Sequence, residues 1–388
     1  MPSANQSPPP LRPLRVLYVL GHGGFGGIER HVESLLRNLD CRAVEPHLCV
    51  VMEPGPISDR IADSGVPVHV IHAHNGHEAR IIPAFRAILS AVRPDLIHAH
   101  ELQAFVLAAC WLHRDIPLVV SIHCALFHGS PNLWWSWLAG RTIERRVDYY
   151  LPVSQATWQA AQHYCGLAPE RGTVFHNVID LLELPVKRKD DVCQELGIAA
   201  STPLLGMAGR MVAQKDWPAF FATCAEISRL RPDAIFLAIG DGPLRATLAQ
   251  DPQARALGDR LRWLGFREDA RRLIGALDIF LCTSLHEELP TTLLEAFAMR
   301  TPVVGFLPRG GTREVLALSR EPIAILSEDR DCQQAARHAV ELLQNPPQVA
   351  ALTSQAHTLV AQHFAAGTQV NRLCAIYQDV LARKSLRS

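Results

Sequence analysis

The 388-residue sequence has no excess of charge of either sign, because Lys and Arg together number 38 and so do Asp and Glu. Proteins that bind nucleic-acid phosphates need a basic surface, so we expect no nucleic-acid partner. No apolar run approaches the roughly 18 residues that predict a membrane-spanning helix. Residues 1–14 are rich in proline, lack the apolar core of a signal peptide, and are expected to form a flexible tail.

The ten cysteines include no C-x-x-C pair, the spacing that is typical of zinc and redox sites. Most stand singly among apolar residues, as Cys49, Cys110, Cys224 and Cys282 do. Such cysteines predict buried thiols in a reducing compartment. Together with the lack of a predicted leader or membrane span, they lead us to expect a cytoplasmic protein.

Length and composition indicate a soluble globular protein with two domains. A chain of 388 residues, 48% of them hydrophobic and 20% charged, exceeds one ordinary core. Short β-rich runs alternate with helical segments over residues 15–180, ending in a predicted strand at 173–178, and again over 203–366. This alternation predicts an α/β fold with two Rossmann-like, doubly wound parallel sheets. Residues 181–202 are the predicted linker, and a deep cleft between facing domains is the expected ligand site.

A glycine-rich segment, GHGGFGG, separates the first predicted strand from an amphipathic helix. Glycines let backbone N–H groups approach an anion at the positive end of a helix. Gly21, Gly23 and Gly26 also satisfy G-x-G-x-x-G, and Glu53 follows the next strand where a ribose-binding acid would lie. Two interpretations stay open, a phosphate-binding loop and a tight turn that simply needs glycine.

Fourteen of the eighteen histidines precede Asp180. Two groups close in sequence raise a metal hypothesis: His72, His74 and His77, and His98 with His100. A zinc site needs fixed geometry and usually a thiolate or carboxylate companion, and nothing in the sequence singles out one set of ligands. We therefore expect polar strand-end residues and no metal.

His123 differs because it closes the fifth predicted strand, SIH, at the ligand-facing end of the sheet. It could therefore enter the central cleft. The alternative is a histidine that only forms a hydrogen bond at the end of a strand.

Residues 133–147 place aromatic and basic side chains at helical spacing. These are Trp134, Trp137, Leu138 and Arg141, followed by Arg145 and Arg146. We expect this face to pack in the core or to cover an acceptor. The alternative is peripheral contact with a membrane surface.

Two pairs of charged residues follow predicted strands of the second series. Arg210 and Lys215 lie five positions apart after the strand PLLGMAG, where they could clamp two phosphate groups. Glu287 and Glu295 flank Leu289-Pro290 between the strand LDIFLC and a helix. The carboxyl ends of parallel strands are where ligands bind in open α/β sheets. Both acids could face that site, although they could also be solvated surface charges.

In this order and spacing, the motifs resemble those of retaining glycosyltransferases of GT-B fold, most closely the family 4 group that uses nucleotide-sugar donors. The resemblance covers nearly the whole chain from Arg15. The motifs are GGFGGIE, the strand-end His123, HNVID with Asn177, GR-x4-K, GDGPLR, the E-x7-E pair with TPVVGF, and GG-x-x-E. Residues 367–385 resemble the last helix of the fold, which returns to the first domain.

The resemblance implies a role for each matching residue. Arg210 and Lys215 would neutralise the donor pyrophosphate, and backbone N–H groups after Pro290 would lie near the phosphates. Leu289, Pro290 and Thr291 would belong to the donor-binding loop. His123 and Glu287 would contact the transferred sugar, and Glu295 would hold the ribose hydroxyls. The loop of Gly26 and Gly27 would approach the phosphates, and Asn177 would also contact the donor.

The family implies further properties of the reaction. It is expected to need no cofactor and no metal, because the cations and the helix terminus take the metal's place. Retention of configuration is expected by front-face attack of the acceptor, since no nucleophile suited to double displacement stands out. The expected acceptor is a saccharide or a lipid-linked molecule of cell-surface polysaccharide, lipopolysaccharide or glycolipid assembly.

One residue departs from the family pattern. Glu288 stands where the loop usually has glycine, which adds a side chain and a negative charge beside the expected sugar and phosphates. Three alternatives to a transferase remain: a GT-B nucleotide-sugar epimerase, an inactive nucleotide-sugar-binding homologue, and an NAD-dependent oxidoreductase that uses Gly21, Gly23, Gly26 and Glu53.

Overall fold

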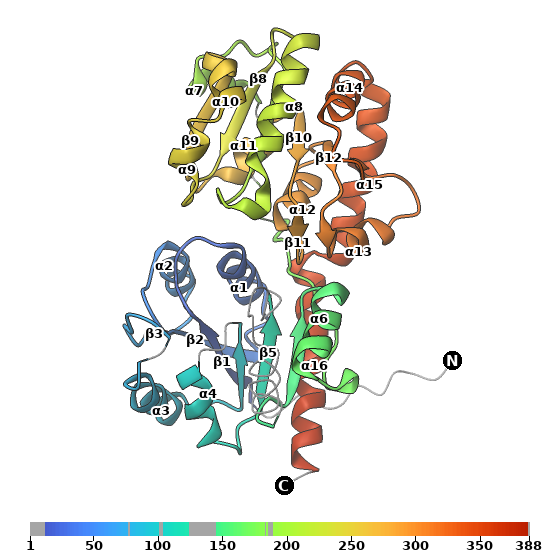
Figure 1. Ribbon diagram of the computed structural model, residues 1–388. Helices are drawn as coiled ribbons and strands as arrows, with labels where there is room; N and C mark the ends of the chain where they lie inside the picture. The colour runs from blue at the N-terminus through green and yellow to red at the C-terminus, as the bar shows by residue number, and fades with distance from the viewer. Residues whose placement is uncertain are drawn as a thin grey trace, which may run out of the picture. The chain divides into compact units, whose positions relative to one another are not determined.

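The computed structural model describes residues 12–76, 78–100, 104–123, 145–182, 184 and 189–386. They fold into two compact units, Met1–Val178 with Ala366–Ser388, and Ile179–Ala365 (Figure 1). None of the described helices is both long enough and apolar enough to span a membrane. The first unit is called unit 1 and the second unit 2.

Unit 1 contains a parallel six-stranded sheet in the order β3-β2-β1-β4-β5-β6. Its strands are β1 (Leu14–Leu20), β2 (Val44–Val50), β3 (Val68–Val70), β4 (Leu96–Ala99), β5 (Leu118–Ile122) and β6 (Tyr149–Pro152). Its α-helices are α1 (Gly27–Arg37), α2 (Pro56–Asp63), α3 (Ile81–Val92), α4 (Ala104–Trp111), α6 (Gln155–Cys165) and α16 (Ala366–Ser385). A short 3-10 turn, η1, covers Pro169–Arg171.

Alternate residues of β1 belong to two separate cores, because successive side chains of a strand point to opposite faces. Val16, Tyr18 and Leu20 pack with α1, α2 and α16, whereas Leu17 and Val19 pack with α3, α4 and α6. The sheet is therefore covered on both faces. This arrangement explains why β1 reads as a continuous apolar run rather than an alternating one.

The strand predicted at residues 173–178 is wrong. The segment runs beside β6, where Thr173 N–H donates to Tyr150 O at 3.1 Å and Phe175 N–H donates to Pro152 O at 2.8 Å. Pro152 has no N–H to return a bond, so a full ladder cannot form along this edge. The segment therefore follows the sheet without being a strand of it.

The C-terminal helix α16 packs within unit 1. Its residues Val370, Leu373, Tyr377 and Val380 belong to the same core as Val16 of β1. The buried Tyr377 hydroxyl lies 2.6 Å from His98 Nδ1 and 3.1 Å from the Tyr18 hydroxyl. A polar chain thus joins the end of the sequence to β1 and β4.

Unit 2 contains a second parallel six-stranded sheet, in the order β14-β12-β10-β7-β8-β9. Its strands are β7 (Leu204–Ala208), β8 (Ile235–Ile239), β9 (Leu261–Gly265), β10 (Ile279–Cys282), β12 (Val303–Phe306) and β14 (Ile325–Ser327). Beyond this sheet, β11 (His286–Glu287) pairs with β13 (Arg309–Gly310). The prediction of an α/β fold with two parallel, doubly wound sheets is confirmed.

The helices of unit 2 follow its strands in alternation. They are α7 (Lys189–Leu196), α8 (Trp217–Leu230), α9 (Arg245–Leu248), α10 (Pro252–Leu257), α11 (Ala270–Ala276), α12 (Thr291–Ala298), α13 (Thr312–Ala317), α14 (Cys332–Leu343) and α15 (Pro346–His363), with 3-10 turns η2 (Ala213–Lys215) and η3 (Gly258–Arg260). The apolar face of α8 supplies Trp217, Phe220 and Phe221 to the core of the sheet.

Replacing Tyr377 by phenylalanine should destabilise unit 1, because His98 Nδ1 would then be buried without its partner. We expect the free energy of unfolding to fall by about 1–3 kcal/mol, the usual cost of an unsatisfied buried polar group. Tyr164→Phe is the control, since the half-buried Tyr164 hydroxyl bonds to no described residue. Urea unfolding of both variants measures the difference, and equal free energies would contradict the assignment.

Candidate functional site

The predicted site residues of unit 2 follow β7 and β10, in the two loops and in the helix α12. The loops after β7 and β8 approach each other closely, and Gly209 N–H donates to Ile239 O at 2.9 Å. Gly240 has a φ of +137°, and a Cβ there would collide with the carbonyl of Gly209. Glycine in the GDG motif is therefore needed for the two strand ends to meet.

Lys215 and Glu287 form a buried ion pair. The Lys215 Nζ lies 2.5 Å from Glu287 Oε1, and the two side chains are only 15% and 9% exposed. The neighbouring Gln214 fixes the same two segments, because its Nε2 donates to His286 O at 2.7 Å and its carbonyl accepts from Leu285 N–H at 2.8 Å. The sequence placed these residues in separate roles, and the structure brings them together.

Arg210 lies at the same strand end but is exposed. Its carbonyl accepts from Trp217 Nε1 at 3.3 Å, which fixes the main chain. Its guanidinium forms no ion pair with any residue that the structure describes. Arg210 is therefore a cation available to an anionic ligand, whereas Lys215 already has one carboxylate partner.

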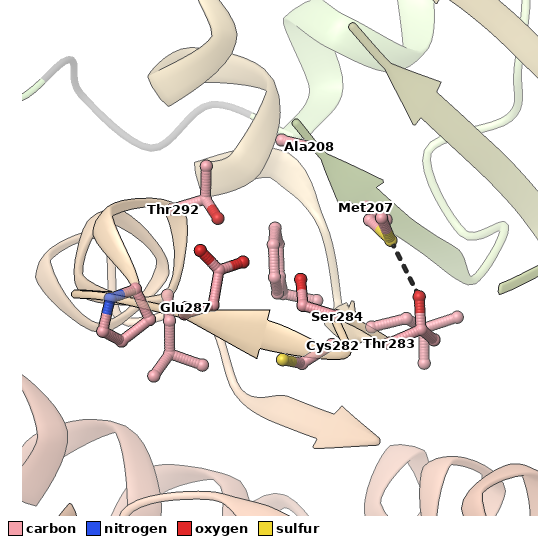
Figure 2. Close-up of a pocket in the computed structure, with 11 residues that line it drawn as sticks. Met207, Ala208, Cys282, Thr283, Ser284, Glu287 and Thr292 are labelled. Atoms are coloured by element: carbon pink, nitrogen blue, oxygen red, sulfur yellow. Dashed lines mark hydrogen bonds between the residues drawn. The ribbon is translucent and has the colours of Figure 1, made fainter. Parts of the chain in front are cut away.

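A small pocket lies between the end of β10 and the start of α12 (Figure 2). Glu287 and Thr292 line it, together with Cys282 and Ser284. Burial, and to a smaller extent the Glu287 carboxylate, raises the pKa of the Cys282 thiol to about 12. A thiol that stays protonated is a poor nucleophile, so Cys282 is not suited to covalent catalysis.

The N-terminus of α12 follows the pocket directly. Pro290 occupies the cap position, and no side chain caps the helix. Thr291 N–H donates to Leu289 O at 2.9 Å, and Leu294 N–H donates to Pro290 O at 3.0 Å. The intervening N–H groups of the first turn have no intrahelical partner, which is the arrangement that favours an anion at a helix N-terminus.

Glu295 is held by a residue that the sequence did not suggest. Arg271 on α11 donates from Nε to Glu295 Oε1 at 2.9 Å, and both side chains are nearly buried, at 12% and 7% exposed. A buried carboxylate needs such a partner to remain ionised. The pair leaves the second carboxylate oxygen, Oε2, without this guanidinium contact.

Glu288, the departure from the family pattern, folds back onto the loop. Its Oε1 lies 3.2 Å from His286 Nε2, and its side chain is 19% exposed. The hydrogen bond to Glu288 raises the pKa of His286 above its ordinary value, against the opposing effect of burial. The added carboxylate is therefore directed to a neighbouring side chain rather than freely into solvent.

In unit 1, the predicted residue His123 joins two other imidazoles at the carboxyl end of the sheet. His123 Nε2 lies 3.1 Å from His100 Nδ1. His31 from α1 packs edge-on against both rings, with centroids 5.5 Å away in each case. Val178 N–H donates to His31 Nδ1 at 3.0 Å, so neutral His31 carries its proton on Nε2.

These imidazoles are uncharged. Burial lowers the pKa of His123 to about 4 and of neighbouring His98 to about 3, and it lowers the pKa values of His31 and His100 as well. Asn177, which lies nearby, partly offsets the decrease of the His123 pKa. The group therefore offers hydrogen bonds without charge.

One nitrogen of each of His31, His100 and His123 lies within 4.8 Å of the others, which makes them the candidate metal group in the described ranges. Neither histidine group suggested by the sequence forms it. His72 and His74 are exposed, and His77 lies outside the described residues. One ring nitrogen of each member is engaged, by Val178 N–H in His31 and by the neighbouring imidazole in His100 and His123. His100 Nε2 and His123 Nδ1 are buried without a hydrogen-bond partner in the part of the chain that the structure describes.

Two glycines of the loop after β1 have different roles, since Gly23 allows close packing and Gly26 caps α1. A Cβ on Gly23 would collide with Ser58 and the Gly55 amide, so the tight-turn interpretation holds there. Gly26 is the cap residue of α1 and Gly27 its first residue. A Cβ on Gly26 would meet the Glu29 carboxylate, which therefore already lies at this helix N-terminus.

The aromatic and basic segment at 133–147 falls largely outside the described residues, including Trp134, Trp137, Leu138 and Arg141. Arg146 is described, and its guanidinium is buried. It donates to the carbonyls of Cys110 at 2.6 Å and Ile116 at 2.9 Å. Arg146 therefore packs in the core, which is the first of the two expectations for this face, and its guanidinium holds neighbouring loops in place.

Sequence reasoning missed three residues of these sites, His31, Gln214 and Arg271. Gln214 is adjacent to the predicted Lys215, so its position in the GR-x4-K loop was a usable signal. His31 lies on the buried face of the first helix, five residues after Gly26. The sequence gave no indication of Arg271, because its contact joins two helices through residues that are 24 positions apart.

Two family models match the chain in succession. Residues 25–182 match the model described as Glycosyltransferase Family 4, and residues 202–345 match the model described as Glycosyl transferases group 1. Together the two matches cover most of the chain.

Several known proteins are similar in sequence. The 2-deoxystreptamine N-acetyl-D-glucosaminyltransferase of Streptomyces fradiae is 28% identical over 324 residues, which is 75% of this chain and 76% of that protein. The UDP-Gal:alpha-D-GlcNAc-diphosphoundecaprenol alpha-1,3-galactosyltransferase of Escherichia coli is 26% identical over 274 residues, or 66% and 70% of the two chains.

A similar solved structure is that of Anabaena Alr3699/HepE in complex with UDP and glucose. It has a TM-score of 0.81 and 21% sequence identity, and the match covers 94% of this chain and 100% of that one. At this identity the likeness shows the fold, which is GT-B.

Replacing Glu288 by glutamine should lower the pKa of His286 toward the ordinary value near 6.5, because the charged hydrogen-bond acceptor is lost. In the wild type, the pair should stabilise the fold below about pH 6.5, and this contribution should disappear as pH rises through the raised pKa of His286. Histidine ring NMR titration measures the change, with exposed His163 as the internal control. An unchanged His286 pKa in the variant would contradict the assigned contact.

Proposed function

Since the chain belongs to the family 4, group 1 glycosyltransferases of GT-B fold, we propose that it moves a sugar from a nucleoside-diphosphate sugar to a saccharide or lipid-linked acceptor. Transfer retains the anomeric configuration and contributes to cell-surface polysaccharide, lipopolysaccharide or glycolipid assembly. The observation that carries the proposal is the grouping of Arg210, Lys215 and Glu287 at the strand ends of unit 2, next to the uncapped N-terminus of α12.

The donor pyrophosphate is assigned to the cations of this group. Arg210 offers a full guanidinium fork, which suits two phosphate oxygens. An ammonium has three N–H donors, so Lys215 can keep its bond to Glu287 and still donate to phosphate. The first turn of α12, after Leu289, Pro290 and Thr291, adds backbone donors. As the sugar leaves, these preorganised groups stabilise the growing negative charge on the leaving diphosphate.

The two carboxylates bind hydroxyl groups in this proposal. Glu287 Oε1 is occupied by Lys215, which leaves Oε2 to accept from the transferred sugar. Glu295 Oε1 is occupied by Arg271, which leaves Oε2 for the ribose hydroxyls of the nucleotide. Neither acid then needs to act as a nucleophile, and the acceptor attacks from the front face.

For unit 1 we propose that His123 and Asn177 contact the donor, and that the loop of Gly26 and Gly27 approaches its phosphates. A neutral imidazole suits an uncharged hydroxyl, because it can donate or accept without adding charge. The Glu29 carboxylate at the start of α1 would have to move for a phosphate to bind there. A cytoplasmic location and peripheral membrane contact stay predictions.

The donor and acceptor classes are suggested by the relatives. One similar structure contains UDP and glucose, and the Escherichia coli relative is named for a UDP-galactose donor and a lipid-linked acceptor. The Streptomyces fradiae relative is named for transfer to 2-deoxystreptamine. We therefore propose a UDP-sugar as the donor to be tested first. The family assignment argues against the oxidoreductase alternative based on Gly21, Gly23, Gly26 and Glu53.

A thermal-shift panel of UDP, GDP, ADP and NAD tests the donor class, and a hydrolysis assay over their sugar forms tests turnover. We expect stabilisation by one nucleoside diphosphate and its sugar, and slow release of that sugar without epimerisation. EDTA should leave turnover intact, because no metal takes part in the proposed mechanism. Stabilisation by NAD alone would reject the proposal, and an epimerised product would favour the epimerase.

Replacing Lys215 by alanine should lower kcat/KM by about 10²–10³-fold, because an electrostatic contact to the leaving diphosphate is lost. Lys189→Ala is the matched control, since Lys189 also pairs with a carboxylate, Asp278, at 2.6 Å but outside the site. Because Lys215→Ala leaves Glu287 buried and unpaired, the double variant K215M/E287Q is measured beside it. Wild-type turnover in folded Lys215→Ala would refute the phosphate role.

A further inference from the structure

Lys215 is followed by a residue in an uncommon backbone conformation. Asp216 has a φ of +49°, in the left-handed region that residues other than glycine rarely adopt. Its carboxylate accepts from Ala219 N–H at 3.4 Å and so caps α8. A non-glycine residue stays in this region only when its surroundings hold it there, and such residues cluster at functional sites.

Arg330, between β14 and α14, supplies the main contact to Asp216. Its Nη2 donates to Asp216 Oδ2 at 2.5 Å and to Thr283 O at 2.6 Å, and its Nη1 donates to Ser284 O at 3.3 Å. The guanidinium lies over the buried Phe306 ring, with its Cζ 4.7 Å from the ring centroid. The Arg330 side chain therefore joins the loop after β7 to the residues that directly follow β10.

Thr283 continues this connection to Lys215 itself. Its hydroxyl lies 3.1 Å from the carbonyl oxygens of both Lys215 and Asp216. Arg330 thus holds Thr283 through its carbonyl, and Thr283 holds Lys215 through its hydroxyl. Four residues beyond Thr283 the same chain segment reaches Glu287, the ion-pair partner of Lys215.

We propose that Arg330, acting through Asp216 and Thr283, is a positioning residue for the Lys215 and Glu287 pair. The inference rests on the role of Lys215 given under Proposed function. Arg330 touches neither member of the pair, so it acts by fixing the two loops that carry them. Lysine should replace it only in part, because an ammonium lacks the planar fork with which Arg330 reaches the Asp216 carboxylate and two carbonyls together.

A purely stabilising role makes a different prediction. The Arg330 side chain is 32% exposed, and ion pairs at exposed sites contribute little to overall stability. We therefore expect Arg330→Met to change the unfolding temperature little while it lowers kcat about 10–100-fold. The expected order of turnover is wild type, then Arg330→Lys, then Arg330→Met. Arg231→Met is the matched control, because Arg231 pairs with Asp233 at 3.0 Å and is 28% exposed at the opposite end of the sheet.

A double-mutant cycle separates positioning from other effects. Turnover of the best nucleotide sugar from the donor panel is measured for Lys215→Ala, Arg330→Met and K215A/R330M. If Arg330 acts through Lys215, the double variant should equal Lys215→Ala, whereas multiplied defects would overturn the inference.

The remaining outcomes identify which proposal fails. A defect in Lys215→Ala with normal turnover in Arg330→Met overturns only the role of Arg330. Normal turnover in Lys215→Ala overturns the phosphate role and the present inference together. If Arg330→Met does not fold, Thr283→Val tests the same connection, because it removes the hydroxyl contact to the Lys215 carbonyl and keeps the side-chain shape. A normal kcat in folded Thr283→Val would then overturn the inference.

Discussion

The organisation of unit 2 depends on one buried ion pair, between Lys215 and Glu287. Two charges that are withdrawn from water must remain close together, because separating them in a low-dielectric environment is costly. The pair therefore fixes the distance between the loops after β7 and β10. Gln214, Thr283 and Arg330 bond the main chains of the same loops. The positions of Lys215 and Glu287 are in this way fixed by contacts within the protein itself.

Unit 1 differs from unit 2 at the carboxyl end of its sheet, because it has uncharged imidazoles there and no ion pair among the described residues of this cluster. Its polar groups are neutral imidazoles, and burial keeps them so by lowering their pKa values. Since no charge has to be balanced, His98, Ser121 and Tyr377 can form a continuous hydrogen-bonded chain within the core. The last helix of the sequence is thereby joined to the strands that carry His98 and His123.

Glu288 shows how a departure from a family pattern can be accommodated locally. A glycine at this position would leave room beside the ligand, and a carboxylate would repel a phosphate if it pointed there. His286 draws the carboxylate back along the loop. The residue then changes the charge and shape of this loop without pairing with Lys215, which binds Glu287.

Strand and helix alternation, together with a few motifs, determined the fold class, because a buried parallel strand must be apolar and a βα turn must be compact. Spacing also determined that Arg210, Lys215, Glu287 and Glu295 follow strands of one sheet. Only the tertiary structure decided their partners, such as Arg271 for Glu295, because those contacts join segments that are distant in sequence. Likewise, the strand predicted at 173–178 was wrong because its pairing depended on a neighbour, Pro152, that lacks an N–H.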